Sequence, residues 1–91
     1  MEFYAFNNHQ WCTIHLNEEG QIITVQITAN DCPVVMKSYE DDEFKWSAIK
    51  AISLILHWDK ECFKRMREML NPEWKKIAED LRLKERNSWD F

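Results

Sequence analysis

The spacing of apolar residues changes once along this chain, near residue 40, and this change most constrains the fold. Before it, apolar and polar residues alternate, which is typical of strands with one buried face. After it, apolar residues recur every three or four positions, which is typical of amphipathic helices. Strands followed by helices predict an α+β fold, in which an antiparallel meander of three or four strands is covered on one face by two or three helices.

Two segments, 11–16 and 21–29, carry the clearest alternation. Their apolar residues on one face are Cys12, Ile14 and Leu16 in the first segment and Ile23, Val25 and Ile27 in the second. A four-residue hairpin loop would pair Ile14 with Ile23 and align the two apolar faces, whereas a tighter loop would pair Ile14 with Thr24. We favour the first register.

Weaker strands are predicted on either side, at 2–6 and at 33–39. With 91 residues the chain is expected to form a single domain, with a β meander in 1–39 and a helical part in 40–91.

The helical part carries one apolar stripe at helical spacing. It consists of Phe44, Ala48, Ala51, Ile52, Ile55, Cys62, Phe63, Met66, Met69 and Leu70. Asp59 interrupts it, so either one long helix buries a carboxylate or the helix breaks near residue 58 and Asp59 caps a second helix. Asn71 followed by Pro72 predicts the start of a further helix, because proline is favoured at the first helical position.

No catalytic, metal-binding or cofactor-binding residue is expected. His9, Cys12 and His15 have the spacing of a metal half-site, but strand alternation sends Cys12 to the face opposite the two histidines. Gly20 is the sole glycine, so no glycine-rich phosphate loop is available. Cys12, Cys32 and Cys62 are widely spaced, and 1–4 does not begin a signal sequence, so we expect free thiols and a cytoplasmic protein without a membrane role.

Charge is distributed unevenly. Residues 1–43 contain eight acidic residues and one basic residue, whereas 44–91 contain eight acidic and eleven basic residues. The run from Glu40 to Glu43 could imitate phosphates to a basic groove. Acids at a helix start are also favoured by the helix dipole, but that local effect does not explain Glu18 and Glu19 at the hairpin tip.

Four of the five tryptophans divide into two groups. Trp58 and Trp74 fall on core stripes, but Trp11 shares a strand face with Thr13 and His15, and Trp46 lies off the main helical stripe. Segment 48–58 is apolar almost all round, so a further element, a second copy or another protein must cover its far side. The predicted partner-binding residues are therefore Glu18, Glu19, Glu40, Asp41, Asp42, Glu43, Trp11, His15 and Trp46.

These residues predict a non-catalytic inhibitor that blocks a basic, nucleic-acid-handling protein by electrostatic mimicry. In size and composition the chain resembles the small, acidic, glycine-poor proteins that phages and other mobile elements use against host nucleases, anti-CRISPR proteins among them. The resemblance rests on no motif and implies no role for any particular residue.

Two alternative functions remain. An immunity protein or antitoxin would share the acidic face and differ only in its partner. A nucleic-acid-binding module would use the basic helices, although acids are interleaved with their basic residues.

Overall fold

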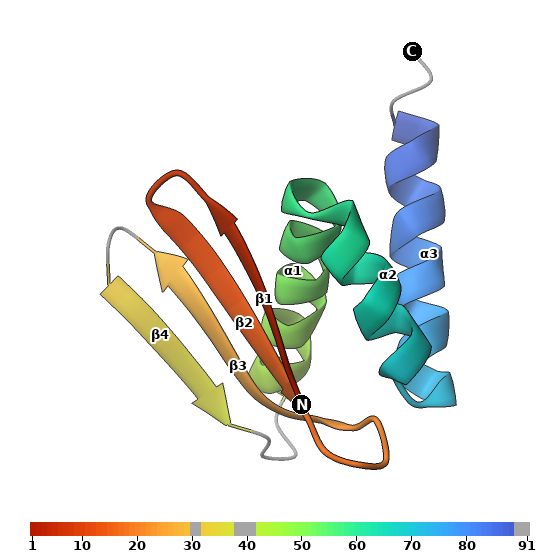
Figure 1. Cartoon of the computed structure of the whole chain (residues 1–91), viewed down its shortest axis with the longest axis horizontal. Helices are drawn as coiled ribbons and strands as arrows, with labels where there is room; N and C mark the ends of the chain where they lie inside the picture. Colours follow the sequence, from red (N-terminus) through yellow and green to blue (C-terminus); the bar gives the residue numbers. More distant parts are fainter. Residues whose placement is uncertain (30–31, 38–41, 89–91) are drawn as a thin grey trace.

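The computed structural model describes residues 1–29, 32–37 and 42–88 and confirms the α+β fold. Figure 1 shows the arrangement of its strands and helices. The strands are β1 (Glu2–Asn7), β2 (Gln10–Leu16), β3 (Ile22–Ala29) and β4 (Cys32–Lys37), and the helices are α1 (Asp42–Trp58), α2 (Lys60–Met69) and α3 (Pro72–Ser88). The four strands form one antiparallel sheet in the order β1-β2-β3-β4.

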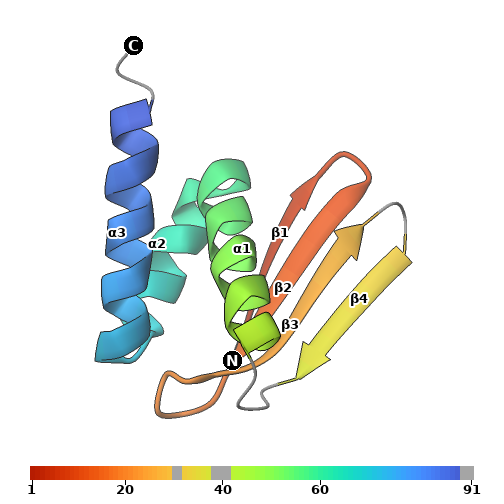
Figure 2. The same ribbon diagram turned by 180° about the vertical axis from the view of Figure 1, so that it is seen from behind.

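All three helices lie on the same side of the sheet (Figures 1 and 2). Helix α1 contacts all four strands, and α2 contacts β1. Within the described residues, α3 contacts only α1 and α2, so it forms a further layer beyond them. The core lies between the sheet and α1 and α2, and its largest fully buried side chains include Ile14, Leu16, Val25, Ile52, Ile55, Phe63 and Met66.

The favoured pairing of β2 with β3 is wrong. The tighter loop is the one that forms, since the Asn17 N–H donates to the Gln21 carbonyl at 3.0 Å, but the pair of Ile14 with Thr24 that it predicted does not form. Ile14 pairs with Val25 and Leu16 pairs with Ile22, because the register shifts between His15 and Leu16. The extra residue on β3 is Ile23, which is 39% exposed, whereas Ile22 is only 3% exposed. Strict alternation would send Ile22 and Val25 to opposite faces, and this β-bulge lets the core bury both.

The helix breaks where Asp59 interrupts the apolar stripe. The Asp59 carboxylate accepts a hydrogen bond from the Cys62 backbone N–H at 3.1 Å, which makes Asp59 the N-cap of α2. The predicted start of α3 is confirmed, because the Asn71 side-chain oxygen accepts from the Trp74 backbone N–H at 2.9 Å. Met69 was predicted on the buried stripe, but it is exposed in the last turn of α2.

Gly20 lies where the β2–β3 loop meets the junction between α2 and α3. Its φ of +81° is in the left-handed region, and its carbonyl accepts a hydrogen bond from the Asn71 N–H at 3.0 Å. A Cβ on Gly20 would lie 2.6 Å from the Asn71 nitrogen and closer still to the Met69 carbonyl oxygen. The glycine is therefore required by tertiary packing as well as by the hairpin.

Replacing Gly20 with Ala is expected to lower the free energy of unfolding by about 2 kcal/mol or more, because the new Cβ meets backbone atoms and occupies a strained φ. Chemical denaturation followed by circular dichroism measures the change. The neighbouring exposed Glu19→Ala variant is the control and should change stability by no more than about 0.5 kcal/mol. Equal stability of the two variants would contradict the packing described here.

Candidate binding surface

The face of the sheet opposite the helices is not covered by any described element (Figures 1 and 2). Its side chains alternate with those that enter the core, and the register places them in rows across the strands. They are Glu2, Tyr4 and Phe6 on β1, Trp11, Thr13 and His15 on β2, and Thr24, Gln26 and Thr28 on β3. We refer to these nine residues as the open face.

Three aromatic side chains gather at one end of the open face. Tyr4 is 51% exposed and Phe6 is 57% exposed, while Trp11 is partly buried. The Tyr4 and Trp11 ring centroids lie 6.4 Å apart at an interplanar angle of 31°, and Phe6 pairs with Trp11 across the strands. We call Tyr4, Phe6 and Trp11 the aromatic strip. A water-facing sheet surface is usually polar, so this strip is a candidate interaction surface.

The other end of the open face is polar. The His15 Nδ1 lies 3.8 Å from a Glu2 carboxylate oxygen, and both side chains are largely exposed. Solvent screens such a pair, so it adds little to stability and both groups stay accessible. The structure thus places the two predicted partner contacts on β2, Trp11 and His15, on the same open face.

The acidic residues predicted to bind a partner are only partly described. Glu18 and Glu19 are exposed in the β2–β3 loop, where the Asn17 side-chain oxygen accepts from the Glu19 N–H at 2.9 Å and the Gln21 N–H at 3.0 Å. Glu40 and Asp41 lie outside the described residues, as do the side chains of Asp42 and Glu43. Helix α1 nevertheless begins at the same end of the sheet as the β2–β3 loop (Figures 1 and 2).

Trp46 does not join the aromatic strip. It is 73% exposed on α1, and α1 packs against the covered face of the sheet, so the sheet separates Trp46 from Trp11. The sequence showed that both side chains leave the core, but not that they leave it on different sides. The strip instead contains Tyr4 and Phe6, which were not predicted to bind a partner. Their alternation with Phe3 and Ala5 indicated that one of the two pairs leaves the core, but not which pair.

The described cysteines and histidines do not converge. Cys12 points into the core, where its Sγ lies 3.8 Å from the Ala51 carbonyl oxygen, while His9 is exposed in the β1–β2 turn and His15 is on the open face. The expected separation of Cys12 from the two histidines is confirmed. Among the described residues, no group of three or more His, Cys, Asp or Glu side chains could hold a metal ion.

Burial controls the chemistry of the two described thiols. It raises the pKa of Cys12 from 9.0 to about 12. Burial, followed by the negative charge of Asp59, also raises the pKa of Cys62, whose thiol donates to the Tyr4 carbonyl at 3.4 Å. Both thiols are therefore protonated near neutral pH and are poor nucleophiles.

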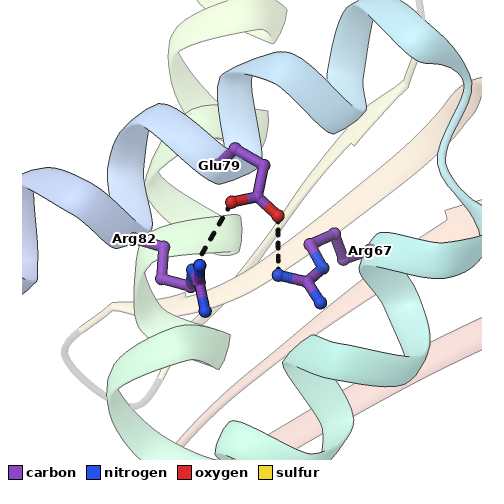
Figure 3. A network of polar contacts seen from close by, with 3 residues as sticks. All are labelled: Arg67, Glu79 and Arg82. Carbon is purple, nitrogen blue, oxygen red and sulfur yellow. Dashed lines mark hydrogen bonds and ion pairs between the residues drawn. The ribbon is translucent and has the colours of Figure 1, made fainter.

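Basic residues on the helices are partly engaged in contacts between helices. Arg67 on α2 lies 2.6 Å from Glu79 on α3, and Arg82 lies 3.4 Å from the other oxygen of the same carboxylate (Figure 3). Arg82 is one of the cations that a nucleic-acid-binding face on these helices would use. Glu79 thus neutralises part of the positive charge on which that alternative function depends.

Comparison with models of known protein families, with curated proteins and with solved structures finds no match to this chain. No helix in the described part of the chain is long and apolar enough to cross a membrane. The fold and the surface together define an α+β protein whose sheet has one covered face and one open face.

In a Cys32→Ser variant, which retains only the two cysteines whose side chains the structure describes, we expect Cys12 and Cys62 to resist alkylation by a maleimide at pH 7.5. Mass spectrometry of the native protein should show no adduct over a time in which the urea-unfolded protein is fully labelled. Rapid labelling of the folded protein would show that one of these thiols is accessible.

The raised pKa of Cys12 also predicts a loss of stability at high pH. The folded thiol keeps its proton up to about pH 12, but the unfolded thiol loses it near pH 9.0, so its contribution is complete below pH 9.0 and declines above it. The slope should approach about 1.4 kcal/mol per pH unit, the value for one proton. Between pH 8 and 11, the free energy of unfolding obtained from denaturation curves should therefore fall less steeply with pH for Cys12→Ala than for the parent protein. Equal slopes would contradict this assignment.

Proposed function

We propose that this protein is a non-catalytic inhibitor that binds a basic, nucleic-acid-handling protein and blocks the surface that would hold nucleic acid. The segregation of charge is the observation that carries the proposal. In residues 1–28 the charged side chains other than histidine are Glu2, Glu18 and Glu19, all exposed, and this segment contains no Lys or Arg. An acidic surface of this kind attracts a basic partner and repels nucleic acid.

The carboxylates of Glu18 and Glu19 form no ion pair or hydrogen bond with a described side chain that would explain why acidic residues occupy these positions. They extend from a loop that Asn17 and Gly20 hold in place through side-chain and backbone hydrogen bonds. A rigid loop presents charge at a lower entropic cost than a flexible one, so the loop is suited to binding. Its acidity serves no evident purpose in stabilising the fold.

The aromatic strip supplies the second requirement of a binding surface. Tyr and Trp side chains contribute a large share of the energy at protein interfaces, while surrounding charges mainly set the association rate and the choice of partner. Glu2 lies on the same strand face as Tyr4, so acidic and aromatic groups adjoin. A catalytic function is less well supported, because the described thiols are protonated and buried.

The small size, acidic charge and single glycine fit a counter-defence protein of a phage or mobile element, similar in kind to anti-CRISPR proteins and acting in the cytoplasm. An immunity protein or antitoxin would present the same surface to a different partner. Direct nucleic-acid binding by the helices is the weaker alternative, because the ion pairs of Glu79 engage Arg67 and Arg82.

A charge-reversal experiment tests the proposal. The tagged protein is used to capture proteins from nuclease-treated and untreated halves of a bacterial lysate, and bound proteins are identified by mass spectrometry. We expect a basic, nucleic-acid-handling protein to be retained, and we expect Glu18→Lys/Glu19→Lys to reduce its capture at least about tenfold, since each close charge pair at an interface is worth about 1.5 kcal/mol or more.

The matched control is Glu68→Lys/Asp80→Lys, which makes the same change in net charge at exposed positions on α2 and α3. This variant should capture the partner as the parent protein does. Equal loss in both double variants would mean that overall charge, and not the β2–β3 loop, governs binding. Capture that disappears with nuclease treatment, together with direct DNA or RNA binding that weakens steeply with salt, would favour the helices as a nucleic-acid surface instead.

A further inference from the structure

We propose that the aromatic strip and Glu2 together form a site for arginine side chains of the partner protein. This inference rests on the proposed function, in which the partner presents a basic surface, and it specifies the chemistry by which that surface is recognised. The occupant is an arginine-bearing segment of a protein.

The geometry of β1 brings the necessary groups into one row. Glu2, Tyr4 and Phe6 occupy alternate positions and so project from the same face, with successive residues about 7 Å apart along the strand. Tyr4 and Phe6 are both more than half exposed, and Trp11 on β2 supports Tyr4 from the side. The Glu2 carboxylate therefore adjoins the accessible ring of Tyr4, and the ring of Phe6 continues the row beyond Tyr4.

This combination matches a guanidinium group better than an ammonium group. A guanidinium is planar and weakly hydrated, so it can stack on an aromatic ring while its N–H groups donate to a nearby carboxylate. A lysine ammonium is compact and strongly hydrated, and it gains less from stacking. The row on β1 thus offers both of the interactions that distinguish arginine from lysine.

Few positive charges compete for the site. The Met1 ammonium, which precedes Glu2, donates to the Leu16 carbonyl at 2.9 Å. The exposed contact between His15 and Glu2 at 3.8 Å is weak enough for an incoming guanidinium to replace. The four strands contain one further basic residue of the Lys or Arg type, which is Lys37. Lys37 pairs with Thr24, so it belongs to the same row across the sheet as Glu2, but it lies three strands away. At the usual strand spacing this separation is about 14 Å.

The charge of the open face disfavours two other occupants. Nucleic-acid bases can stack on aromatic rings, but single-strand binding also needs cations for the phosphates, and residues 1–28 provide no Lys or Arg. A second copy packed face to face would bring its own acidic surface toward Glu2. Charge complementarity instead selects a cationic segment of another protein.

The test is a titration of the full ¹⁵N-labelled chain, followed by NMR, with a nine-residue Gly–Ser peptide that carries three arginines. Parallel titrations use the same peptide with lysine or with uncharged citrulline at those positions. We expect the arginine peptide to shift the amides of Glu2, Tyr4 and Phe6 and the Trp11 indole N–H. Binding should be about threefold or more weaker for lysine and absent for citrulline.

Three variants assign the contribution of each group. Tyr4→Leu/Phe6→Leu retains apolar side chains but removes two rings, and Glu2→Gln removes the carboxylate, so both should weaken binding of the arginine peptide severalfold. Trp46→Leu removes an exposed aromatic ring from the helical layer and should leave binding unchanged. Each variant should give a spectrum of a folded protein before the titration begins.

Several results would overturn the inference. One is equal binding of the arginine and citrulline peptides, and another is chemical-shift changes confined to the helices or to the β2–β3 loop. A third is a change in the chemical shifts of the aromatic strip on addition of a single-stranded oligonucleotide. The last is a change in the same chemical shifts with protein concentration alone. The last result would identify the open face as an interface between two copies of the chain.

Partner capture separates this inference from the proposed function. If capture is lost in Glu18→Lys/Glu19→Lys but unchanged in Tyr4→Leu/Phe6→Leu, the inhibitor function stands and the arginine site is refuted. If the arginine peptide binds at the strip but no basic protein is captured, the site stands and the inhibitor function is refuted.

Discussion

The burial of α1 on two sides is the constraint on which the rest of the structure depends. The helix contacts all four strands on one side and α2 and α3 on the other, which accounts for a segment that is apolar almost all round. The sequence left open whether a further element, a second copy or another protein covers its far side. The answer is largely within the chain, since Leu54 and Trp58 pack against the core while α3 lies beyond.

The same arrangement determines which face of the sheet stays open. Because every helix lies on one side of the sheet, the opposite face is left to side chains that need only tolerate water, and yet β1 and β2 place three aromatic residues there. These rings do not belong to the core between the sheet and α1, and their packing on this face is limited to contacts such as that of Tyr4 with Trp11. The open face is thus the part of the molecule whose composition the fold explains least.

The element order and the start of α3 could be predicted from the sequence because they depend on local signals. Alternation defines the strands, and the side chain of Asn71 and the ring of Pro72 define the start of α3. The role of Asp59 was ambiguous, because the sequence allows both a cap and a position inside one long helix. Only the three-dimensional structure shows that the helix breaks there and leaves backbone N–H groups for the Asp59 carboxylate to bind. The register of β2 with β3 failed for a comparable reason, because the bulge at Ile23 depends on the core that Ile22 joins.

Tyr4, Phe6 and Trp46 mark the limit of prediction for the candidate surface. Alternation shows that Tyr4 and Phe6 lie on the strand face opposite to that of Phe3 and Ala5. Only the packing of the helices shows which of these two pairs faces solvent. Exposure alone also could not show that Trp46 and Trp11 lie on different sides of the sheet. The charge pattern was more readily interpreted, because an excess of acidic residues over several strands and loops persists in any packing of those elements. The arginine-bearing partner that we propose would offer cations on an apolar background, which complements a surface that is acidic by composition and aromatic by topology.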